Sequence, residues 1–399
     1  MPIGTPFHER TLALCESLNY RDWSGYYTVS CYETHHEHEY NAIRNAAALI
    51  DISPLYKYRI AGRDAARLID RIVTRDINRV AVGQVIYTPW CDEHGKVIDD
   101  GTVSRLGEDS YRWTAADPNL RWFHQNASGL DVRIDDVSET LAALALQGPA
   151  SARLLNTVSD GAVSDLKYFH VRAARIAGVG VEISRTGYTG DLGYEIWMSA
   201  EHAIRVWDAL MQAGRAFDIH PAGMLALDVA RIEAGLLLID VDFHGSKKAL
   251  IESQKYSPFE MGLGRLVDLD KEAFVGRAAL IEEQRRRPVR RIVGLEVDWP
   301  SLEKIYERVG LPPAMSAAAS RTAVPVYDGS QVGKATSTTW SPTLKKLIAL
   351  ATVDRDSAVI GQKLEMEITV EAVRYRTPVT VVKTPFFNPK RKTETPPAC

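Results

Sequence analysis

The sequence predicts a mixed α+β protein of two or three domains, and three observations lead to this prediction. A chain of 399 residues is longer than a single compact core usually supports. Residues 84–115 alternate apolar and polar side chains between short turn sequences, which is typical of an antiparallel meander. Residues from 288 onward are rich in β-branched side chains and predict short strands, which indicates a small barrel or sandwich.

Individual elements follow from the spacing of apolar side chains, which recur every three or four residues in helices and alternate in strands. The expected helices are residues 40–51, 64–73, 150–156, 202–214 and 221–235. The expected strands are residues 56–62, 84–90, 96–106, 111–116, 143–147, 179–186, 193–198, 291–297, 323–340, 346–353, 363–370 and 377–386. The arginine-rich run 285–291 marks a domain boundary.

The bulk composition argues against several classes of protein. A net charge of -3 and a pI near 6.4 disfavour a main role on the phosphate backbone of nucleic acid. The four cysteines are widely separated and form no CxxC pair, which disfavours a disulfide framework and a thiolate zinc site. No stretch approaches the roughly 20 apolar residues of a spanning helix, and the N-terminus lacks a signal-peptide pattern. A cytoplasmic protein without membrane or nucleic-acid partners is therefore expected.

The stretch RTGYTGDLGYEIWM, residues 185–198, places a carboxylate in an unusual setting. On an extended strand the flanking apolar side chains point to one side, whereas Glu195 and Trp197 point to the other. A flat heterocycle with two parallel N–H donors would pair with this glutamate in the ring plane and contact the tryptophan. The alternative is a solvated face on which Glu195 pairs with Arg185 across the hairpin.

The segment GKVIDDGTV, residues 95–103, holds two adjacent aspartates. Asp99 and Asp100 alternate faces on a strand, so only one of them points inward. An inward aspartate in the middle of a sheet is unusual unless it is paired or functional. The alternative to a functional role is that Asp99 points outward and Asp100 is ion-paired in the interior.

Other short motifs give weaker signals. The segment ETHHEHEY, residues 33–40, lacks the HExxH pattern of zinc helices, so a solvated polar segment is favoured and no metal is expected. The fragments GVGVEI and GLGRLV lack the third glycine and the helix start of a dinucleotide-binding turn, and no P-loop pattern is present. The sequence also lacks the GxSxG and Cys/His signatures of acyl transfer.

Seven segments in the same order resemble one known family. They are RNAAALIDIS, GKVIDD, ALQGPASARLL, RTGYTGDLGYEI, ARIEAGL, PFEMGLGRLVDLDKEAFVGRAAL and ATSTTWSPTLKKLIAL. Each is weakly specific alone, but their common order is strongly specific. Together they resemble the folate-binding aminomethyltransferase family, typified by the T-protein of the glycine cleavage system. That family also contains tetrahydrofolate-dependent demethylases.

The resemblance implies a fold and a cofactor. The implied fold is α+β, a three-domain cloverleaf around a central folate channel, with two α/β domains built on antiparallel sheets and a C-terminal β-barrel. The expected divisions of the chain are residues 1–143, 144–287 and 288–399, with domains that are discontinuous in the chain. The implied cofactor is tetrahydrofolate.

The resemblance also implies site residues. In that family the glutamate of the YTGxxGxEI motif binds the N–H donors of the pterin, and the second aspartate of the DD pair is catalytic near the folate nitrogens N5 and N10. The catalytic residue implied here is Asp100. The cofactor-binding residues expected here are Glu195, Tyr87, Tyr188, Trp197 and Arg231.

The chain departs from the T-protein pattern around the channel. Pro54 stands where T-proteins have a histidine, and Leu227 stands where they have an arginine that contacts folate, which leaves Arg231 as the nearest basic residue. We therefore expect a tetrahydrofolate-dependent methyltransferase that moves a methyl group from a small O-, S- or N-methylated compound to N5. The alternatives are an aminomethyltransferase that uses a lipoyl carrier protein, and a non-catalytic folate-binding protein.

Aromatic residues near the N-terminus are candidates for binding the methyl donor. They can supply a cation-binding box or a slot with phenolic donors. The expected substrate residues are Tyr26, Tyr27, Tyr32 and Tyr56. The alternative is that the N-terminal aromatic side chains form a packing arm.

Overall fold

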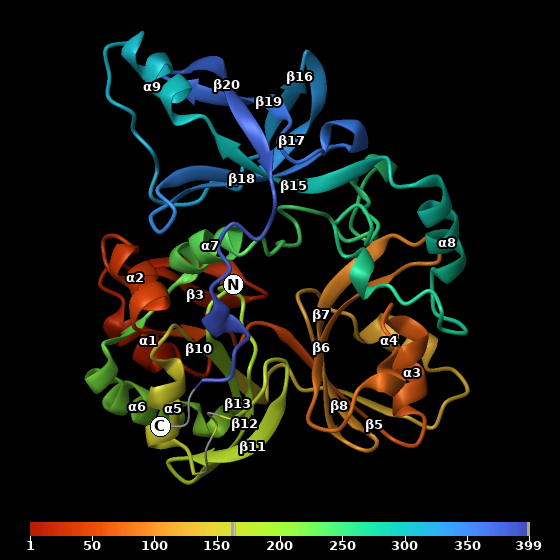
Figure 1. Ribbon diagram of the computed structural model, residues 1–399. Coiled ribbons are helices and arrows are strands. Elements are labelled where there is room, and N and C mark those ends of the chain that lie inside the picture. Colours follow the sequence, from red (N-terminus) through yellow and green to blue (C-terminus); the bar gives the residue numbers. More distant parts are fainter. Residues whose placement is uncertain (161–162, 164, 397–399) are drawn as a thin grey trace.

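The computed structural model describes residues 1–160, 163 and 165–396. Within these residues the strands form three open sheets and one closed barrel, and Figure 1 shows them as three lobes. The barrel forms the upper lobe, a six-stranded sheet lies in the lower left lobe and a five-stranded sheet in the lower right one. The expected α+β architecture with a C-terminal barrel is confirmed.

The five-stranded sheet is antiparallel, with the order β6-β7-β8-β5-β9. Its strands are β5 (Tyr56–Ala61), β6 (Val85–Cys91), β7 (Val97–Gly107), β8 (Ser110–Ala115) and β9 (Arg133–Asp136). One face carries Trp90 and Trp113 and packs against helices α3 (Ala65–Ile72) and α4 (Leu120–Asn126). Because side chains alternate along a strand, the other face carries polar residues. Strands β6, β7 and β8 confirm the predicted meander.

The six-stranded sheet has the order β11-β12-β13-β10-β4-β14. Its strands are β4 (Ala47–Asp51), β10 (Leu141–Gln147), β11 (Val171–Ile176), β12 (Val179–Ser184), β13 (Gly193–Ser199) and β14 (Ile219–Pro221). One face packs against α5 (Ser151–Val158) and α6 (Ala203–Gly214). On the other face, α2 (Glu37–Asn45) and α7 (Met224–Glu233) cover β4 and β10. They leave part of β12 and β13 to face the five-stranded sheet.

The single helix expected over residues 40–51 is wrong. Helix α2 ends at Asn45, and Ala47–Asp51 form β4 inside the six-stranded sheet. Every residue of β4 is buried, so its apolar run does not alternate and matches a helix and a buried strand equally well. This sheet combines β4, which precedes residue 143, with strands β11 to β14, which follow it. The division of the chain at residues 143 and 287 stays a prediction.

The C-terminal strands close into a barrel with the order β15-β18-β17-β16-β19-β20. They are β15 (Arg290–Val297), β16 (Val324–Asp328), β17 (Ser330–Ser341), β18 (Lys346–Asp354), β19 (Lys363–Val370) and β20 (Val373–Val382). Helix α8 (Arg277–Arg286) precedes the barrel, and α9 (Trp299–Glu307) packs Leu302 and Ile305 against the barrel core. The sequence pattern predicted neither helix.

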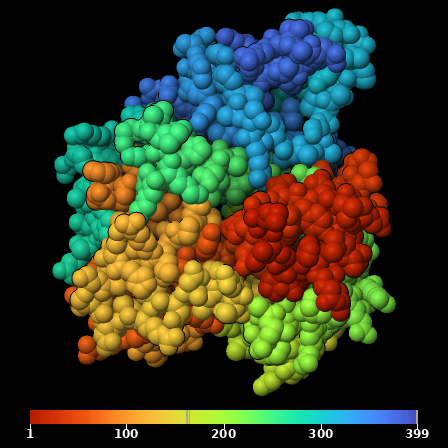
Figure 2. All heavy atoms as spheres, turned by 180° about the vertical axis from the view of Figure 1, so that it is seen from behind, coloured from red at the N-terminus to blue at the C-terminus, as the bar shows by residue number. Residues whose placement is uncertain are grey.

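A small N-terminal sheet completes the fold. It has the order β1-β3-β2, with β1 (Ile3–Gly4), β2 (Asn19–Trp23) and β3 (Tyr26–Cys31). Helix α1 (His8–Leu14) lies between β1 and β2 in the chain. Strand β3 packs against the start of α7, where a Cβ atom on Gly223 would lie 2.6 Å from the Ser30 carbonyl oxygen. Seen from behind, the N-terminal residues fill the surface between the barrel and the lobe of the six-stranded sheet (Figure 2).

Candidate functional site

The polar faces of the two large sheets meet at a cluster of charged side chains. Glu182 of β12 accepts hydrogen bonds from Arg59 of β5 and from Arg112 of β8. The Arg112 guanidinium also lies over the Trp197 ring, 4.2 Å from its centroid. Arg112 is only 1% exposed, and burial lowers the pKa of its guanidinium to about 10. Glu182 and the indole ring compensate this buried charge and hold the two lobes together.

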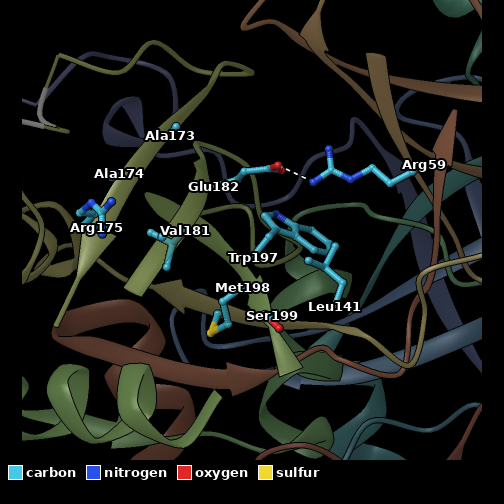
Figure 3. Close-up of a pocket in the computed structure, with 11 residues that line it drawn as sticks. Arg59, Leu141, Ala173, Ala174, Arg175, Val181, Glu182, Trp197, Met198 and Ser199 are labelled. Carbon is cyan, nitrogen blue, oxygen red and sulfur yellow. Dashed lines mark hydrogen bonds and ion pairs between the residues drawn. The ribbon is translucent and has the colours of Figure 1, made fainter. Parts of the chain in front are cut away.

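A pocket of about 450 Å³ opens beside this cluster, and Figure 3 shows Glu182 and Arg59 paired across it. Its lining residues are Arg59, Leu141, Ala173, Ala174, Arg175, Gly180, Val181, Glu182, Trp197, Met198 and Ser199. The pocket therefore lies toward the end of β13. Glu195 lies nearer the start of that strand and does not line it, and neither does Asp100.

Glu195 lies on the face of β13 that is turned toward the five-stranded sheet. Its Oε2 accepts a hydrogen bond of 2.7 Å from the Thr186 hydroxyl, and no arginine or lysine in the described part of the chain forms an ion pair with it. Burial raises the pKa of Glu195, while the Thr186 and Ser184 hydroxyls and the nearby charge of Arg112 lower it in part. The carboxylate therefore keeps acceptor capacity for an external donor.

The alternative pairing of Glu195 with Arg185 is wrong. Arg185 is fully buried and donates its hydrogen bonds to backbone carbonyls, including those of Leu166 at 3.1 Å and Lys392 at 3.3 Å.

Trp197 is 2% exposed and donates from Nε1 to the Ser184 hydroxyl at 3.2 Å. One face of its indole ring is covered by Arg112, so its contact with a ligand stays a prediction.

The two aspartates of the DD pair have different partners. Asp99 points inward and accepts hydrogen bonds from the Asn119 amide at 2.9 Å and from the backbone N–H groups of Asp100 and Asp117. Asp100 lies on the opposite, polar face and accepts a hydrogen bond of 2.5 Å from the Tyr87 hydroxyl. The arrangement with Asp99 outside and Asp100 ion-paired is therefore wrong. Within the described residues, no cation pairs with Asp100.

Electrostatics set Asp100 apart from an ordinary surface aspartate. Burial raises its pKa to about 6, the Tyr87 hydrogen bond opposes this shift, and the charge of Asp117 adds to it. A carboxyl group with a pKa near neutrality can hold or release a proton under physiological conditions. Asp100 is therefore a candidate for proton transfer, and Tyr87 is its hydrogen-bond partner.

Tyr188 joins this group from the loop between β12 and β13. Its hydroxyl donates to the Leu237 carbonyl. Burial raises the pKa of Tyr188, Arg231 lowers it and the charge of Asp100 raises it further, which places the ring near both charges. The structure thus brings Tyr87, Asp100 and Tyr188 near one another, and their roles at a folate site stay predictions.

The Arg231 guanidinium forms its hydrogen bonds with other residues of the protein. It is 1% exposed and donates to Asp228 at 2.8 Å, to Asp242 at 2.5 Å and to the Ser337 hydroxyl at 2.7 Å. These bonds join α7 to the following loop and to β17 of the barrel. Arg231 positions elements of the fold, and its predicted contact with the cofactor stays a prediction.

The four tyrosines predicted to bind substrate do not form one group. Tyr32 is 3% exposed in a small N-terminal core, and Tyr27 is exposed and stacks on His8. Tyr26 is half-buried, and burial and the charges of Glu139, Tyr56 and Asp136 raise its pKa, which places it near Tyr56. Only Tyr26 and Tyr56 are thus brought together.

The histidine-rich segment uses its side chains in local contacts. His38 pairs with Glu33 at 2.8 Å, and His36 lies 3.0 Å from the Ala317 carbonyl oxygen. Buried Glu39 accepts hydrogen bonds of 2.7 Å from the N–H groups of Tyr32 and Gly223. Within the described residues, no group of three or more His, Cys, Asp or Glu side chains is arranged to hold a metal ion.

Sequence reasoning missed Arg112 and Glu182, which connect the two sheets. A signal was available, since Arg112 alternates with Tyr111 and Trp113 and Glu182 alternates with Val181 and Ile183. This spacing places both charges on the faces opposite the apolar cores. It does not say that the two faces meet.

Comparison with known families agrees with this architecture. The family model described as the GCVT N-terminal domain matches residues 8–271, and the model described as the glycine cleavage T-protein C-terminal barrel domain matches residues 307–388. The chain belongs to this glycine cleavage T-protein family. The crystal structure of the glycine cleavage system aminomethyltransferase T from Bartonella henselae has a TM-score of 0.81 over 97% of this chain and 99% of that one. At 22% identity, this likeness concerns the fold.

Curated relatives carry two kinds of name. A trimethylamine-oxide aldolase of Ruegeria pomeroyi is 36% identical over 98% of this chain, which spans only 48% of that relative. Aminomethyltransferases of Caldanaerobacter subterraneus and Bacillus subtilis are each 34% identical, over 83% and 88% of this chain and 83% and 90% of their own lengths. No helix among the described residues is long and apolar enough to cross a membrane.

Proposed function

We propose that this protein is a tetrahydrofolate-dependent one-carbon transferase that moves a methyl group from a small methylated compound to N5 of the folate. The observation that carries the proposal is a half-buried Glu195 with hydroxyl partners, Thr186 and Ser184, and no ion-pair partner among the described residues. It lies on the face turned toward the sheet that holds Asp100. The enzyme class and the cofactor rest on this site together with membership of the family.

The donor chemistry of the site suits a reduced pterin. Such a ring offers adjacent N–H donors in one plane, and a carboxylate accepts such a pair through charge-assisted hydrogen bonds. Glu195 uses one acceptor position for Thr186 and has others available. Thr186 also fixes the orientation of the carboxylate, so less side-chain freedom is lost when the ring binds.

The proposed role of Asp100 is to hold or accept a proton beside the reacting nitrogen. Tetrahydrofolate supplies a nucleophilic nitrogen that accepts the one-carbon group. Tyr87 orients the Asp100 carboxylate, and the ring of Tyr188 lies near it. These residues would supply orientation and electrostatic stabilisation rather than covalent chemistry.

Two sequence positions and one curated relative favour methyl transfer over aminomethyl transfer as the reaction of this protein. Pro54 and Leu227 depart from the T-protein pattern. The trimethylamine-oxide aldolase is named for a methylated nitrogen compound, which agrees with a donor of the N-methyl class. The alternative is an aminomethyltransferase that uses a lipoyl carrier protein, and the relatives with that name support it.

The proposal is tested by incubating the protein with tetrahydrofolate and a panel of sulfonium, N-methyl, N-oxide and O-methyl compounds. Formation of 5-methyl-tetrahydrofolate is followed by mass spectrometry, with the Asp100→Asn variant as the control. Methyl transfer from at least one donor by the wild type alone is expected. Transfer only from an aminomethylated lipoyl carrier would favour the alternative.

A further inference from the structure

Asp117 is an additional carboxylate beside Asp100. Its backbone N–H donates to Oδ2 of Asp99 at 2.9 Å, and the backbone N–H of Asp100 donates to Oδ1 of the same carboxylate at 2.8 Å. Asp117 also follows β8, which pairs with β7, the strand that carries Asp100. Backbone contacts therefore fix Asp117 beside Asp100, and its negative charge opposes ionisation of the Asp100 carboxyl group.

A lysine from a distant part of the chain pairs with Asp117. Lys248 Nζ lies 2.5 Å from Oδ1 of Asp117 and 3.1 Å from Oδ2 of Asp240. Among the described residues, no other cation forms an ion pair with Asp117. The Asp117 side chain is 19% exposed and that of Lys248 is 48% exposed, so water screens their interaction only in part.

The segment that carries Lys248 is held against the five-stranded sheet by its backbone. It belongs to the connection between α7 and α8, which lies beside the start of β7 (Figure 1). The Ser246 N–H donates to the Val97 carbonyl at 2.8 Å, and a Cβ atom on Gly245 would lie 2.5 Å from the Ile98 carbonyl oxygen. The glycine therefore allows a close backbone approach that brings the lysine next to the DD pair.

The other titratable and charged groups around Asp100 come from several segments. They are Tyr87, Asp99, Tyr188, Asp240 and His244, with Arg231, Asp228 and Asp242 near Tyr188. Arg231 pairs with Asp228 and Asp242, so its charge is already offset. His244 lies 3.6 Å from an oxygen of Asp240. Lys248 is thus the cation of this set that directly offsets the charge of Asp117.

We propose that Lys248 is a positioning residue for the one-carbon transfer, because its ammonium, held by Asp117, favours the ionised form of Asp100. The catalytic part of this inference rests on the proposed function, in which Asp100 accepts a proton beside the reacting nitrogen. A carboxylate must be ionised before it can accept that proton, so loss of the Lys248 charge should leave less Asp100 in the form that reacts.

The test titrates Asp100 directly, by ¹³C NMR of protein labelled at the aspartate carboxyl carbons, with Asp100→Asn to assign the signal. In Lys248→Met the charge of Asp117 is no longer offset, so the titration midpoint of Asp100 should rise by about 0.5 pH unit or more. In Asp117→Asn the midpoint should fall. In the double variant, the Lys248 change should shift it less, because the ammonium has lost its anchor beside the sheet.

Two further variants separate charge from structure. Lys248→Arg keeps the positive charge and should keep the midpoint of Asp100 near that of the wild type. Lys247→Met removes the neighbouring charge, which lies over the Trp122 ring at 3.7 Å, and should shift the midpoint much less. An unchanged midpoint in Lys248→Met would overturn the inference, and so would an equal shift in Lys247→Met.

The acid limb of the pH-rate profile shows whether the reaction depends on this ionisation. It should move to higher pH in Lys248→Met by the same amount as the NMR midpoint, and it should return in Lys248→Arg. A midpoint that moves while the acid limb stays in place would support the electrostatic role of Lys248 and count against the role of Asp100 in the proposed function.

Discussion

Carboxylates in two regions of this protein have opposite surroundings. Asp242, between α7 and the barrel, is 1% exposed and accepts four hydrogen bonds. Its donors are Arg231, Leu238, Thr336 and Ser337. Glu195 and Asp100, where the two large sheets meet, accept side-chain hydrogen bonds from hydroxyls: Thr186 and Ser184 at Glu195, and Tyr87 at Asp100. Among the described residues, no cation pairs with either of them.

The difference separates carboxylates that hold the fold from carboxylates that keep unused acceptor capacity. A fully bonded carboxylate beside a buried arginine links two elements, and its loss leaves the arginine uncompensated. A partly bonded carboxylate has lost water without gaining full replacement, so it destabilises the free protein and can bind an added donor strongly. Each variant below tests one side of this comparison.

The largest effect is expected for Asp242→Ala. The change leaves the Arg231 guanidinium buried with one of its two carboxylate partners, and the free energy of unfolding should fall by about 3 kcal/mol. Urea denaturation at pH 7 measures this loss. The double variant Asp242→Ala, Arg231→Met should recover part of it, and an equal or larger loss in the double variant would contradict a structural role for the pair.

Asp100→Asn should separate turnover from binding. If Asp100 handles a proton as proposed, removal of its carboxylate should lower turnover by about 10²-fold or more, whereas the Kd for tetrahydrofolate should change little. Steady-state kinetics and calorimetry give the two values. Parallel losses in both would make Asp100 a binding residue instead.

The same variant has an expected effect on stability. The pKa of Asp100 is about 6 in the folded protein and lower in the unfolded chain, so the folded protein binds this proton more tightly. Stability contributed by this group is therefore lost as pH rises from about 4 to 6. Asp100→Asn should unfold at a higher temperature than the wild type at pH 7, and a lower one would show that the carboxylate stabilises the fold.

Glu195→Gln should weaken ligand binding without unfolding the protein. One charge-assisted acceptor is lost, so the affinity for tetrahydrofolate should fall by about 1–3 kcal/mol. The control is Glu201→Gln, which makes the same change at an exposed glutamate in the turn directly after β13. Calorimetry that finds equal affinities for the wild type and Glu195→Gln would count against the pterin assignment.

The smallest effect is expected for Tyr87→Phe. The Tyr87 hydrogen bond lowers the pKa of Asp100, so its removal should raise that pKa further. Activity that needs the ionised carboxylate should then be lost at a higher pH on the acid side of the pH-rate profile. An acid limb that stays in place would mean that Tyr87 and Asp100 are not coupled in the reaction.

The candidate site was only partly predictable from the sequence. Alternation along β7 required Asp99 and Asp100 to face opposite ways, but the inward one proved to be Asp99, because Asn119 and the N–H of Asp117 lie on that side. Arg231 was expected at the ligand, yet two aspartates surround it once α7 packs on the barrel. The apolar run of β4 resembled a helix because burial on both faces removes alternation.

The sequence by itself determined the family, the meander, the barrel strands and the side of β13 on which Glu195 lies, because these depend on local spacing and on ordered motifs. The tertiary structure alone decided that the polar faces of two sheets meet through Arg112 and Glu182. Local spacing fixes the direction of a side chain relative to its own strand. Its partners depend on how distant segments pack, which no short pattern contains.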